Sequence, residues 1–310
     1  MTASVFVDGA AGTTGLEIVE RLAGRSDFAL VVLDEAQRKS EAARREAFHT
    51  ADFAVLCLPD DAAREAVALA AGSKVRIVDA SSAHRVAHGW TYGFPELVGH
   101  EAVASATRVS NPGCYPTGFL ALVAPLVRSG LLPADWPYTV HAVSGYSGGG
   151  KAMIARFEGD SDSEGRDIAW RGYALGGGHK HVPEMQKWAG LTHAPLFAPA
   201  VIPAHRGMVV EVPLPHAVID VDAETLRHAL RSFYADSPVI RVAREAPTDG
   251  ELLLRASTAP SDALTLHVFS GSEGIRLIAL LDNLGKGASG AAVQSLNLMA
   301  GFEESAGLVL

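Results

Sequence analysis

Residues 4–25 read SVFVDGAAGTTGLEIVERLAGR, and this stretch decides which fold to expect. The apolar run at its start predicts a buried strand, and the segment from residue 15 onward has the spacing of an amphipathic helix. Between them lie Gly9, Gly12 and Gly15, which would let the backbone turn sharply and approach the phosphates of a dinucleotide at the helix N-terminus. The spacing is GxxGxxG, not the commoner GxGxxG, so a helix-start turn with packing glycines is the alternative interpretation.

The helical segment places Leu16, Val19 and Leu22 on one face, which we expect to be buried. Strands and helices then alternate to about residue 110. Further strands are predicted at residues 28–34, 51–59 and 74–82, and further helices at residues 36–48 and 60–72. Asp60 and Asp61 are expected to cap the last of these helices. Such alternation implies crossover connections and a parallel sheet that is buried on both faces.

The second half of the chain has longer apolar strands. They are predicted at residues 138–145, 198–215, 264–270 and 274–283, and the first of them runs into a glycine-rich loop. This texture favours a mixed or antiparallel sheet. We therefore expect an α/β protein with a Rossmann-type, doubly wound nucleotide-binding domain at residues 1–113, completed by a helix at 287–310. Residues 114–286 are expected to form an α+β catalytic and oligomerisation domain.

The composition argues against several classes of protein. A formal net charge of -9 and the lack of a long run of Lys and Arg oppose a nucleic-acid-binding role. No apolar tract is long enough to cross a bilayer, and the first residues lack the pattern of a secretion signal. The two cysteines, Cys57 and Cys114, make no disulfide framework, so a reducing, cytoplasmic compartment is expected.

Charged residues after the second predicted strand bear on the choice of cofactor. Asp34 ends that strand about 20 residues after the glycine turn, where an acidic residue would hold the ribose hydroxyls of NAD. Arg38 and Lys39 follow, and a cation there suits the additional phosphate of NADP. We expect NADP as the cofactor, and a solvated helix face is the alternative explanation of these charges.

Residues 110–127, SNPGCYPTGFLALVAPLV, carry the strongest chemical signal. A turn over residues 110–113 precedes an apolar helix predicted over residues 117–127, so Cys114 is expected at or near the helix N-terminus. The helix dipole and the N–H groups there favour a thiolate over a thiol. A thiolate can attack an acyl group, hold it as a thioester and surrender it to hydride. Cys57 lies in an apolar strand and is expected to be buried and inert.

The segment 111–118, NPGCYPTG, resembles the active-cysteine signature of the N-acetyl-gamma-glutamyl-phosphate reductases, and the resemblance extends over essentially the whole chain. Three other segments resemble the glycine-rich substrate loop, the His-x-His-x-Pro-Glu segment and the late cofactor-side turn of that family, at residues 144–151, 179–184 and 282–287. The short chain and the segment CLPDDAAREAV at 57–67 suggest the compact subgroup. Residues 204–208, AHRGM, depart from the pattern of that subgroup.

The motifs and the resemblance together give the expected site residues. By similarity to the family, Cys114 is the nucleophile and His179 the general acid or base. The expected cofactor-binding residues are Gly9, Gly12, Thr13, Thr14, Gly15, Arg38, Ser81, Ser82 and Asn283. The expected substrate-binding residues are Asn111, Ser144, Ser147, Lys151, His181, Glu184 and Arg206. The resemblance also implies a homodimer or homotetramer built through the second domain.

Several histidines could supply the acid–base chemistry that acyl-phosphate reduction needs. His179 and His181 follow the triple glycine at 176–178, so a flexible, exposed approach to the site is expected, and His205 is the runner-up. The His-x-His-x-x-Glu spacing could also be read as metal ligands. Pro183 would interrupt any helix there and no further ligand cluster is in view, so no metal is expected.

The second glycine-rich segment, GYSGGGK at 145–151, nearly fits the P-loop pattern. Ala152 replaces the hydroxyl that would hold magnesium, which disfavours a nucleoside triphosphatase. The loop can still offer N–H groups, two serines and the Lys151 ammonium to the phosphoryl group of a substrate, and a loop that binds nothing is the equal alternative. Arg206 could pair with a substrate carboxylate, with a structural salt bridge as the alternative.

The expected reaction is the NADPH-dependent reduction of N-acetyl-gamma-glutamyl phosphate to N-acetyl-L-glutamate 5-semialdehyde and phosphate, in arginine biosynthesis. It proceeds through a Cys114 thioester, with nearby backbone N–H groups stabilising the oxyanion. An aspartate-semialdehyde dehydrogenase shares this chemistry and is the close rival. A non-catalytic NADP-sensing or scaffold protein is the second rival. A related lysine-pathway or carrier-bound substrate also stays open.

Overall fold

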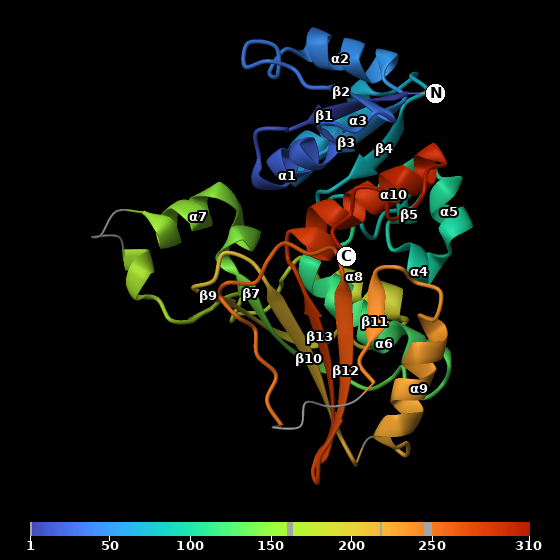
Figure 1. Cartoon of the computed structure of the whole chain (residues 1–310), viewed down its shortest axis with the longest axis vertical. Coiled ribbons are helices and arrows are strands. Elements are labelled where there is room, and N and C mark those ends of the chain that lie inside the picture. The colour runs from blue at the N-terminus through green and yellow to red at the C-terminus, as the bar shows by residue number, and fades with distance from the viewer. Residues whose placement is uncertain (1, 160–163, 218, 245–249) are drawn as a thin grey trace. The chain divides into compact units, whose positions relative to one another are not determined.

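The computed structural model describes residues 2–159, 164–217, 219–244 and 250–310. The chain forms two compact units (Figure 1). Unit 1 consists of Met1–Gly113 and Ala288–Leu308, and unit 2 consists of Cys114–Gly287 and Val309–Leu310. Each unit has its own sheet.

The sheet of unit 1 is parallel throughout, as predicted. Its strands in the described residues are β1 Ala3–Asp8, β2 Phe28–Val31, β3 Phe53–Leu56, β4 Arg76–Asp79, β5 Thr91–Tyr92 and β6 Arg108–Ser110. They lie in the order β2-β1-β3-β4-β6-β5. The direction of winding reverses between β1 and β3, and ligands of doubly wound sheets bind beyond the carboxyl ends of the strands at such a point.

Helices cover both faces of this sheet because neighbouring residues of a buried strand point to opposite sides. The helices of unit 1 are α1 Thr13–Leu22, α2 Glu41–Thr50, α3 Asp60–Leu69, α4 Pro95–Val98, α5 His100–Ala104 and α10 Gly290–Ala300. Val5 of β1 packs with Ile18 of α1 and Leu296 of α10. Its neighbour Phe6 packs with Phe48 of α2 on the other face. Helix α10 therefore completes the core of unit 1 from the far end of the chain.

The buried face of α1 differs from the one expected. Gly15, Ile18 and Leu22 are buried, whereas Leu16 is 51% exposed. Leu16 and Val19 instead line a cavity beside the glycine turn. Leu22 is buried as expected, and Val19 packs partly against the core. The prediction was wrong for Leu16, because Gly15 has no side chain and α1 approaches the turn closely along the Gly15 side.

The glycine turn itself explains that close approach. Gly9 has a φ of +88°, and a Cβ there would lie 2.3 Å from the carbonyl oxygen of Cys57. A Cβ on Gly15 would lie 2.4 Å from the carbonyl oxygen of Gly9. A Cβ on Gly12 would meet no atom closer than 3.4 Å, at a φ of -75°. Packing within unit 1 therefore requires the first and third glycines but leaves room at the second.

Unit 2 contains a mixed sheet, as expected. Its strands in the described residues are β7 Thr139–Gly145, β8 Arg171–Gly172, β9 Leu196–Ile202, β10 Met208–Pro215, β11 Ile240–Val242, β12 Leu264–Ser270 and β13 Gly274–Leu281. Their order is β11-β12-β13-β10-β7-β9-β8. The pairs β7–β9 and β11–β12 are parallel, and the others are antiparallel.

One long apolar helix organises unit 2. Its helices are α6 Cys114–Arg128, α7 Gly150–Glu158, α8 Val182–Ala189 and α9 Ala223–Phe233. Helix α6 contacts β10, β12 and β13 as well as α8 and α9. Gly118 lets α6 lie close to the sheet, since a Cβ there would be 2.8 Å from Val210 Cγ2. Among the described residues, none of the helices has both the length and the apolar character needed to span a membrane.

Two segments expected to be loop or plain helix are more specific structures. The glycine-rich segment after β7 is a short 3₁₀ helix, Tyr146–Gly149, that leads directly into α7, so the expected glycine loop was wrong. The approach to α10 is a π-helical turn, Gly285–Ser289. Such turns occur mostly as single turns and frequently at functional sites.

We predict that Gly15→Ala lowers the free energy of unfolding of the chain by about 1–3 kcal/mol, because the added methyl group would collide with backbone that cannot move aside. Gly12→Ala is the matched control and should change it by less than about 0.5 kcal/mol. Urea titration followed by circular dichroism measures both. Equal stabilities for the two variants would contradict this account of the turn.

Candidate active site

Cys114 is the first residue of α6, which confirms the expected position at a helix N-terminus. Strand β6 ends at Ser110, and the turn Asn111–Gly113 connects it to the helix. The Asn111 N–H donates to the Asp79 carbonyl at 2.7 Å, and Asn111 Nδ2 donates to the Ala288 carbonyl at 2.9 Å. The turn before the cysteine is thus held by backbone on both sides, and a sulfur at this position lies where the helix dipole favours negative charge.

Two tyrosines lie near the thiol. The Tyr115 hydroxyl donates to the Ala200 carbonyl at 3.0 Å, and the Tyr173 hydroxyl lies 3.4 Å from that of Tyr115. Burial raises the pKa of both phenols, and the charge of Cys114 adds to the effect. Both rings therefore stay neutral and act as hydrogen-bonding walls of the site.

His179 lies in an aromatic cluster with these tyrosines. Its ring centroid is 5.6 Å from that of Tyr173, 6.2 Å from that of Tyr115 and 5.1 Å from that of Phe197. The backbone N–H of His181 donates to His179 Nδ1 at 3.1 Å. Because Nδ1 accepts this bond, the neutral ring carries its proton on Nε2 and presents a donor there. The structure thus brings His179 together with residues adjacent to the nucleophile.

The segment after His179 is less exposed than expected. His181 is 6% exposed, and its ring centroid is 4.7 Å from that of His179. Glu184 is 1% exposed and lies in the first turn of α8. The prediction that Pro183 interrupts a helix here was wrong. Pro183 lies in the first turn of α8, where the missing N–H costs no hydrogen bond.

The two serines of the glycine-rich segment are buried, and Ser147 contacts Asn283. Asn283 Nδ2 donates to Ser147 Oγ at 2.9 Å, and its Oδ1 accepts from the Gly207 N–H at 2.9 Å. Ser144 is 2% exposed, and its Oγ donates to the Gly145 carbonyl at 3.0 Å. Asn283, expected at the cofactor, therefore joins the two loops that carry the expected substrate residues, within unit 2.

Arg206 is held by a buried carboxylate. Its Nη1 lies 2.9 Å from Asp282 Oδ2, and Asp282 is 2% exposed. Lys151, in contrast, is exposed in the first turn of α7. His205, the alternative acid or base, pairs with Glu158 at 3.0 Å. Arg206 thus has a fixed direction, and Lys151 is exposed to solvent.

A cavity of about 720 Å³ lies beside the glycine turn of unit 1. Asp8, at the end of β1, lies in its wall, and Arg44 of α2 binds the Asp8 carboxylate at 2.7 Å. Burial raises the pKa of Asp8, and Arg44 opposes that shift. Arg38 and Lys39 line the same cavity. The structure therefore gathers three cations where the loop after β2 borders the cavity.

Asp34 does not have the role that the sequence suggested. Its Oδ1 accepts from the Gln37 N–H at 2.8 Å, and its carbonyl accepts from the Arg38 N–H at 2.9 Å. The carboxylate shapes the turn before α2, and Arg38 Nη2 pairs with Glu35 at 2.8 Å. The Asp34 carboxylate is therefore engaged by the backbone of the turn and does not present this oxygen to a ribose hydroxyl.

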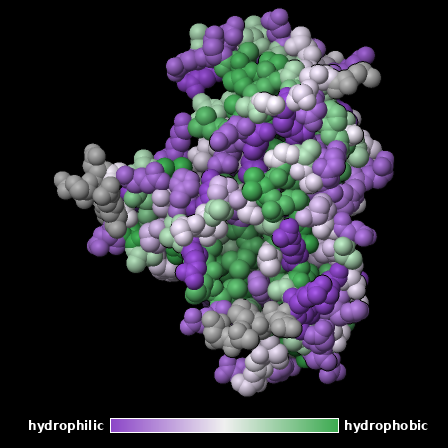
Figure 2. Space-filling view, in the orientation of Figure 1, coloured by the Kyte–Doolittle hydropathy of each residue, from purple (hydrophilic) through white to green (hydrophobic). Residues whose placement is uncertain are grey.

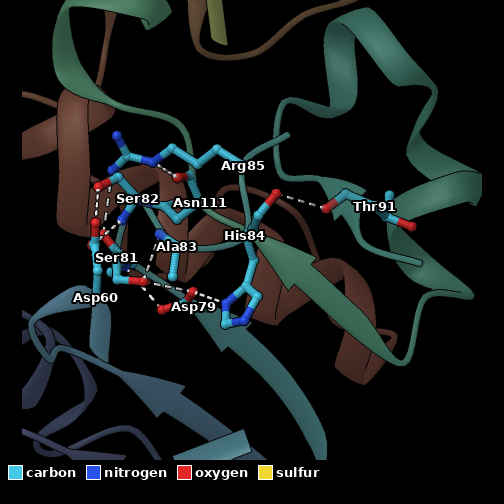
Figure 3. A network of polar contacts seen from close by, with 11 residues as sticks. Asp60, Asp79, Ser81, Ser82, Ala83, His84, Arg85, Thr91 and Asn111 are labelled. Carbon is cyan, nitrogen blue, oxygen red and sulfur yellow. Dashed lines mark hydrogen bonds and ion pairs between the residues drawn. The ribbon is translucent and has the colours of Figure 1, made fainter. Parts of the chain in front are cut away.

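Ser81 and Ser82 follow the carboxyl end of β4 and are fixed by two carboxylates (Figure 3). Asp79 accepts from both the N–H and the Oγ of Ser81, at 2.9 and 2.7 Å. Asp60 accepts from the N–H and the Oγ of Ser82 at the same two distances. The prediction that Asp60 caps α3 was wrong, because its carboxylate binds Ser82 of this loop instead. Asp61 pairs with Arg64 at 2.7 Å.

The loop contains a histidine and an arginine, His84 and Arg85, that the sequence analysis does not single out. His84 Nδ1 lies 2.6 Å from Asp79 Oδ2 (Figure 3). The His84 ring stacks on Trp90. Arg85 is 8% exposed, and its Nε donates to the Asn111 carbonyl at 2.9 Å. The signal in the sequence is a His-Arg pair five and six residues after the carboxyl end of β4. Arg85 connects this loop to the turn before Cys114.

No group of three or more His, Cys, Asp or Glu side chains in the described parts of the chain has the geometry of a metal site. His179, His181 and Glu184 therefore do not form the ligand set that their spacing allows.

Two family models match the chain. The NAD binding domain of semialdehyde dehydrogenases matches residues 4–106, and the semialdehyde dehydrogenase dimerisation domain matches residues 114–283. The first match includes the glycine turn, and the second begins at the candidate nucleophile.

Named relatives resemble the whole chain. An N-acetyl-gamma-glutamyl-phosphate reductase of Trichormus variabilis is 46% identical over 317 residues, covering 98% of both chains. A second such protein, from Pseudomonas putida, is 48% identical and covers 99% of both chains. One from Burkholderia lata is 48% identical over 98% of both.

Solved structures of other semialdehyde dehydrogenases share the fold. The crystal structure of aspartate semialdehyde dehydrogenase II from Vibrio cholerae matches with a TM-score of 0.73 at 19% identity, over 96% of this chain and 98% of that one. Aspartate semialdehyde dehydrogenase with NADP from Candida albicans matches with a TM-score of 0.67 at 14% identity, over 97% and 99%.

The fold is therefore common to both groups, whereas the sequence is close to only one set of these relatives. The two family models together match residues 4–106 and 114–283 of the chain. The chain belongs to the N-acetyl-gamma-glutamyl-phosphate reductase family, within the semialdehyde dehydrogenases.

Proposed function

We propose that this protein is an NADPH-dependent reductase that converts N-acetyl-gamma-glutamyl phosphate to N-acetyl-L-glutamate 5-semialdehyde and phosphate, a step of arginine biosynthesis. The observation that carries the proposal is a cysteine at the N-terminus of α6, beside Tyr115 and Tyr173, with His179 in the same aromatic cluster. The names of the relatives supply the substrate. Phosphorylated N-acetylglutamate fits a site whose chemistry requires an acyl group with a good leaving group.

The nucleophilic step uses Cys114. Its thiolate attacks the γ-carbonyl carbon, a C–S bond forms, and the bond from carbon to the phosphate oxygen breaks, so that a thioester and inorganic phosphate result. The helix N-terminus stabilises the sulfur anion, and the backbone N–H groups of the first turn of α6 suit the oxyanion. Bound NADPH supplies the hydride that reduces the thioester.

His179 takes up the proton of the Cys114 thiol and, once both of its ring nitrogens are protonated, returns a proton as the thiohemiacetal collapses to aldehyde and thiol. In the described conformation its Nδ1 is occupied by the His181 N–H, and its Nε2–H is the donor. In this tautomer the Nε2–H group can donate a hydrogen bond to the acyl oxygen as negative charge develops there. Uptake of a proton by His179 as a second donor at Nδ1 requires that the bond to the His181 amide be released.

The substrate groups match charged and polar residues of unit 2. Arg206, held by Asp282, can bind a carboxylate, and Lys151 can approach a phosphoryl group. His181 precedes α8 and lies beside His179, and Glu184 lies in the first turn of α8; we assign contacts with the N-acetyl amide to these two residues.

Asn111, in the turn before Cys114, is a further residue that we assign to the substrate. It is 1% exposed, and its Oδ1 has no hydrogen-bond partner among the described residues. A buried carbonyl oxygen without a donor costs free energy, so a substrate N–H there would be favourable.

The cavity of unit 1 suits NADP. The backbone of the glycine turn can approach a pyrophosphate. Packing within unit 1 does not require a glycine at position 12, so close approach of a ligand is the reason that we assign to Gly12. Arg38, Lys39 and Arg44 border the cavity, whereas the Asp34 carboxylate is engaged in the turn before α2. Arg38 pairs with Glu35 and Arg44 with Asp8, so the three cations outnumber these two carboxylates, and a net positive charge here favours the 2′-phosphate of NADP over the bare ribose of NAD.

We also infer a homodimer or homotetramer built through the sheet of unit 2. The face opposite α6 carries partly exposed Val209 and Leu280, which are paired across β10 and β13, and Figure 2 shows apolar surface over these strands. Glu211 and Arg276 form an ion pair on the same face. The description of the matching model as a dimerisation domain supports this assignment.

The cytoplasm is the compartment that we assign. Cys57 and Cys114 both remain as thiols in the structure, and the proposed chemistry requires a reduced Cys114.

Cys114→Ser should lower the rate of phosphate-dependent oxidation of N-acetylglutamate semialdehyde by about 10³-fold or more, because a hydroxyl is a far weaker nucleophile than a thiolate. The measurement is NADPH formation at saturating phosphate, with NADPH binding followed by fluorescence. Cys57→Ala is the matched control and should stay active. Turnover by Cys114→Ser at the normal rate, or preference for aspartate semialdehyde, would refute the proposed function.

The two cysteines should also differ in reactivity. Burial, with smaller contributions from Asp79 and Asp8, raises the pKa of the partly buried Cys57 thiol to about 12. At pH 8 only about one Cys57 in 10⁴ is then ionised. We expect iodoacetamide to label Cys114 selectively from pH 7 to 9, as measured by peptide mass spectrometry. Comparable labelling of Cys57 in the folded protein would contradict this assignment.

Arg38→Gln should weaken NADPH binding about tenfold and leave NADH binding unchanged, because only NADPH carries the phosphate that a cation there would contact. Arg45→Gln is the matched control, since Arg45 lies on the next helix in an exposed pair with Glu41. Fluorescence titration of each variant with both cofactors decides the matter. If Arg38→Gln weakens NADPH and NADH binding equally, Arg38 does not select between the two cofactors, and this assignment is wrong.

A further inference from the structure

Cys114 packs against Gly287, which lies in the turn over residues 282–287. A Cβ on Gly287 would lie 3.0 Å from Cys114 Cβ and 3.4 Å from Cys114 Cα, so the first residue of α6 packs directly on this position. The Gly287 N–H donates to the Asp282 carbonyl at 3.0 Å, which closes the turn. The position of Cys114 therefore depends on the turn over residues 282–287.

A second segment holds this turn from behind. A Cβ on Gly285 would lie 1.9 Å from the Ser261 carbonyl oxygen and 3.0 Å from Asp262 Oδ1, so residues 261–262 touch the turn backbone. The Ser261 N–H also donates to Asp282 Oδ2 at 3.3 Å, beside the Arg206 guanidinium. Movement of residues 261–262 would therefore move the turn.

Asp262 is in turn fixed by Val309. The Val309 N–H donates to Asp262 Oδ2 at 2.8 Å, and the Asp262 N–H donates to the Val309 carbonyl at 2.6 Å. Asp262 is 1% exposed, whereas the Val309 side chain is 52% exposed. The attachment is thus made by backbone and a buried carboxylate, not by apolar packing of the valine.

We propose that Asp262 and the backbone of Val309 form a clamp that positions the Cys114 nucleophile through the turn over residues 282–287. The inference rests on the proposed function only in naming Cys114 as the nucleophile. Asp262 is a positioning residue, since it acts on the thiol through Gly285 and Gly287. Residues 288–308 belong to unit 1, so Val309 attaches to unit 2 at the point where the chain returns to it.

The test compares two shortened chains. A chain that ends at Leu308 lacks both Val309 bonds, and a chain that ends at Val309 keeps them and loses only the exposed Leu310. Small misplacements of reacting groups cost up to about 10²-fold in rate. The chain that ends at Leu308 should therefore lose about 10-fold or more in kcat, with the Kd for NADPH unchanged. The chain that ends at Val309 should match the full chain.

The second readout is the pH profile of Cys114 alkylation by iodoacetamide, which needs no substrate. A displaced sulfur loses part of the stabilisation at the helix N-terminus, so the profile of the chain that ends at Leu308 should shift to higher pH. Asp262→Ala should give the same shift. Asp262→Asn keeps an acceptor oxygen for the Val309 N–H and should largely restore both readouts, which a general loss of stability would not explain.

The outcomes separate the two proposals. Identical alkylation profiles for the chains ending at Leu308 and at Val309, with Asp262→Asn no better than Asp262→Ala, would overturn the clamp and leave the proposed function intact. A shifted profile in a protein that does not turn over N-acetylglutamate semialdehyde would support the clamp and refute the proposed function. If Asp262→Ala does not fold, the two shortened chains still decide the question.

Discussion

The packing of the Cys114 backbone against Gly287 is the contact on which the rest of the site depends. A helix N-terminus can stabilise a thiolate only if the sulfur is held there, and the first residue of a helix is also its least constrained one. In this protein the constraint comes from outside the helix, through a turn that has no side chain at the point of contact. Side-chain chemistry at Cys114 is therefore set by backbone geometry more than 160 residues further along the chain.

Buried or partly buried carboxylates shape several of the loops that carry the site. Asp79 and Asp60 order the loop after β4, Asp282 orders the turn behind Cys114, and Asp262 holds the segment behind that turn. Each accepts at least one backbone N–H. A carboxylate is expensive to bury without partners, and the same cost makes a loop that satisfies it well defined. Polar groups thus give these loops the rigidity that apolar packing gives the sheets.

The two glycine-rich segments, at residues 9–15 and 145–150, adopt different structures for a physical reason. The first lies at the carboxyl end of a central parallel strand, where Gly9 and Gly15 allow backbone to meet backbone and Gly12 stays open to a ligand. The second follows β7 and closes into a 3₁₀ helix and α7, while Ser147 is fixed by Asn283. Glycine content alone does not distinguish these outcomes, because both loops have the same local freedom.

Local pattern determined a large part of this protein. The alternation of strands and helices predicted the parallel sheet, the apolar run after residue 114 predicted α6, and the motif around Cys114 indicated the family. These features depend on neighbours in sequence, which periodicity and turn chemistry record. Only tertiary contacts decided that Gly15 and Ile18 form the buried face of α1, that Asp34 and Asp60 bind backbone N–H groups and that His181 is buried. The contacts of Asp262 with Val309 and of Gly287 with Cys114 join residues 47 and 173 positions apart, and no local pattern records such pairs.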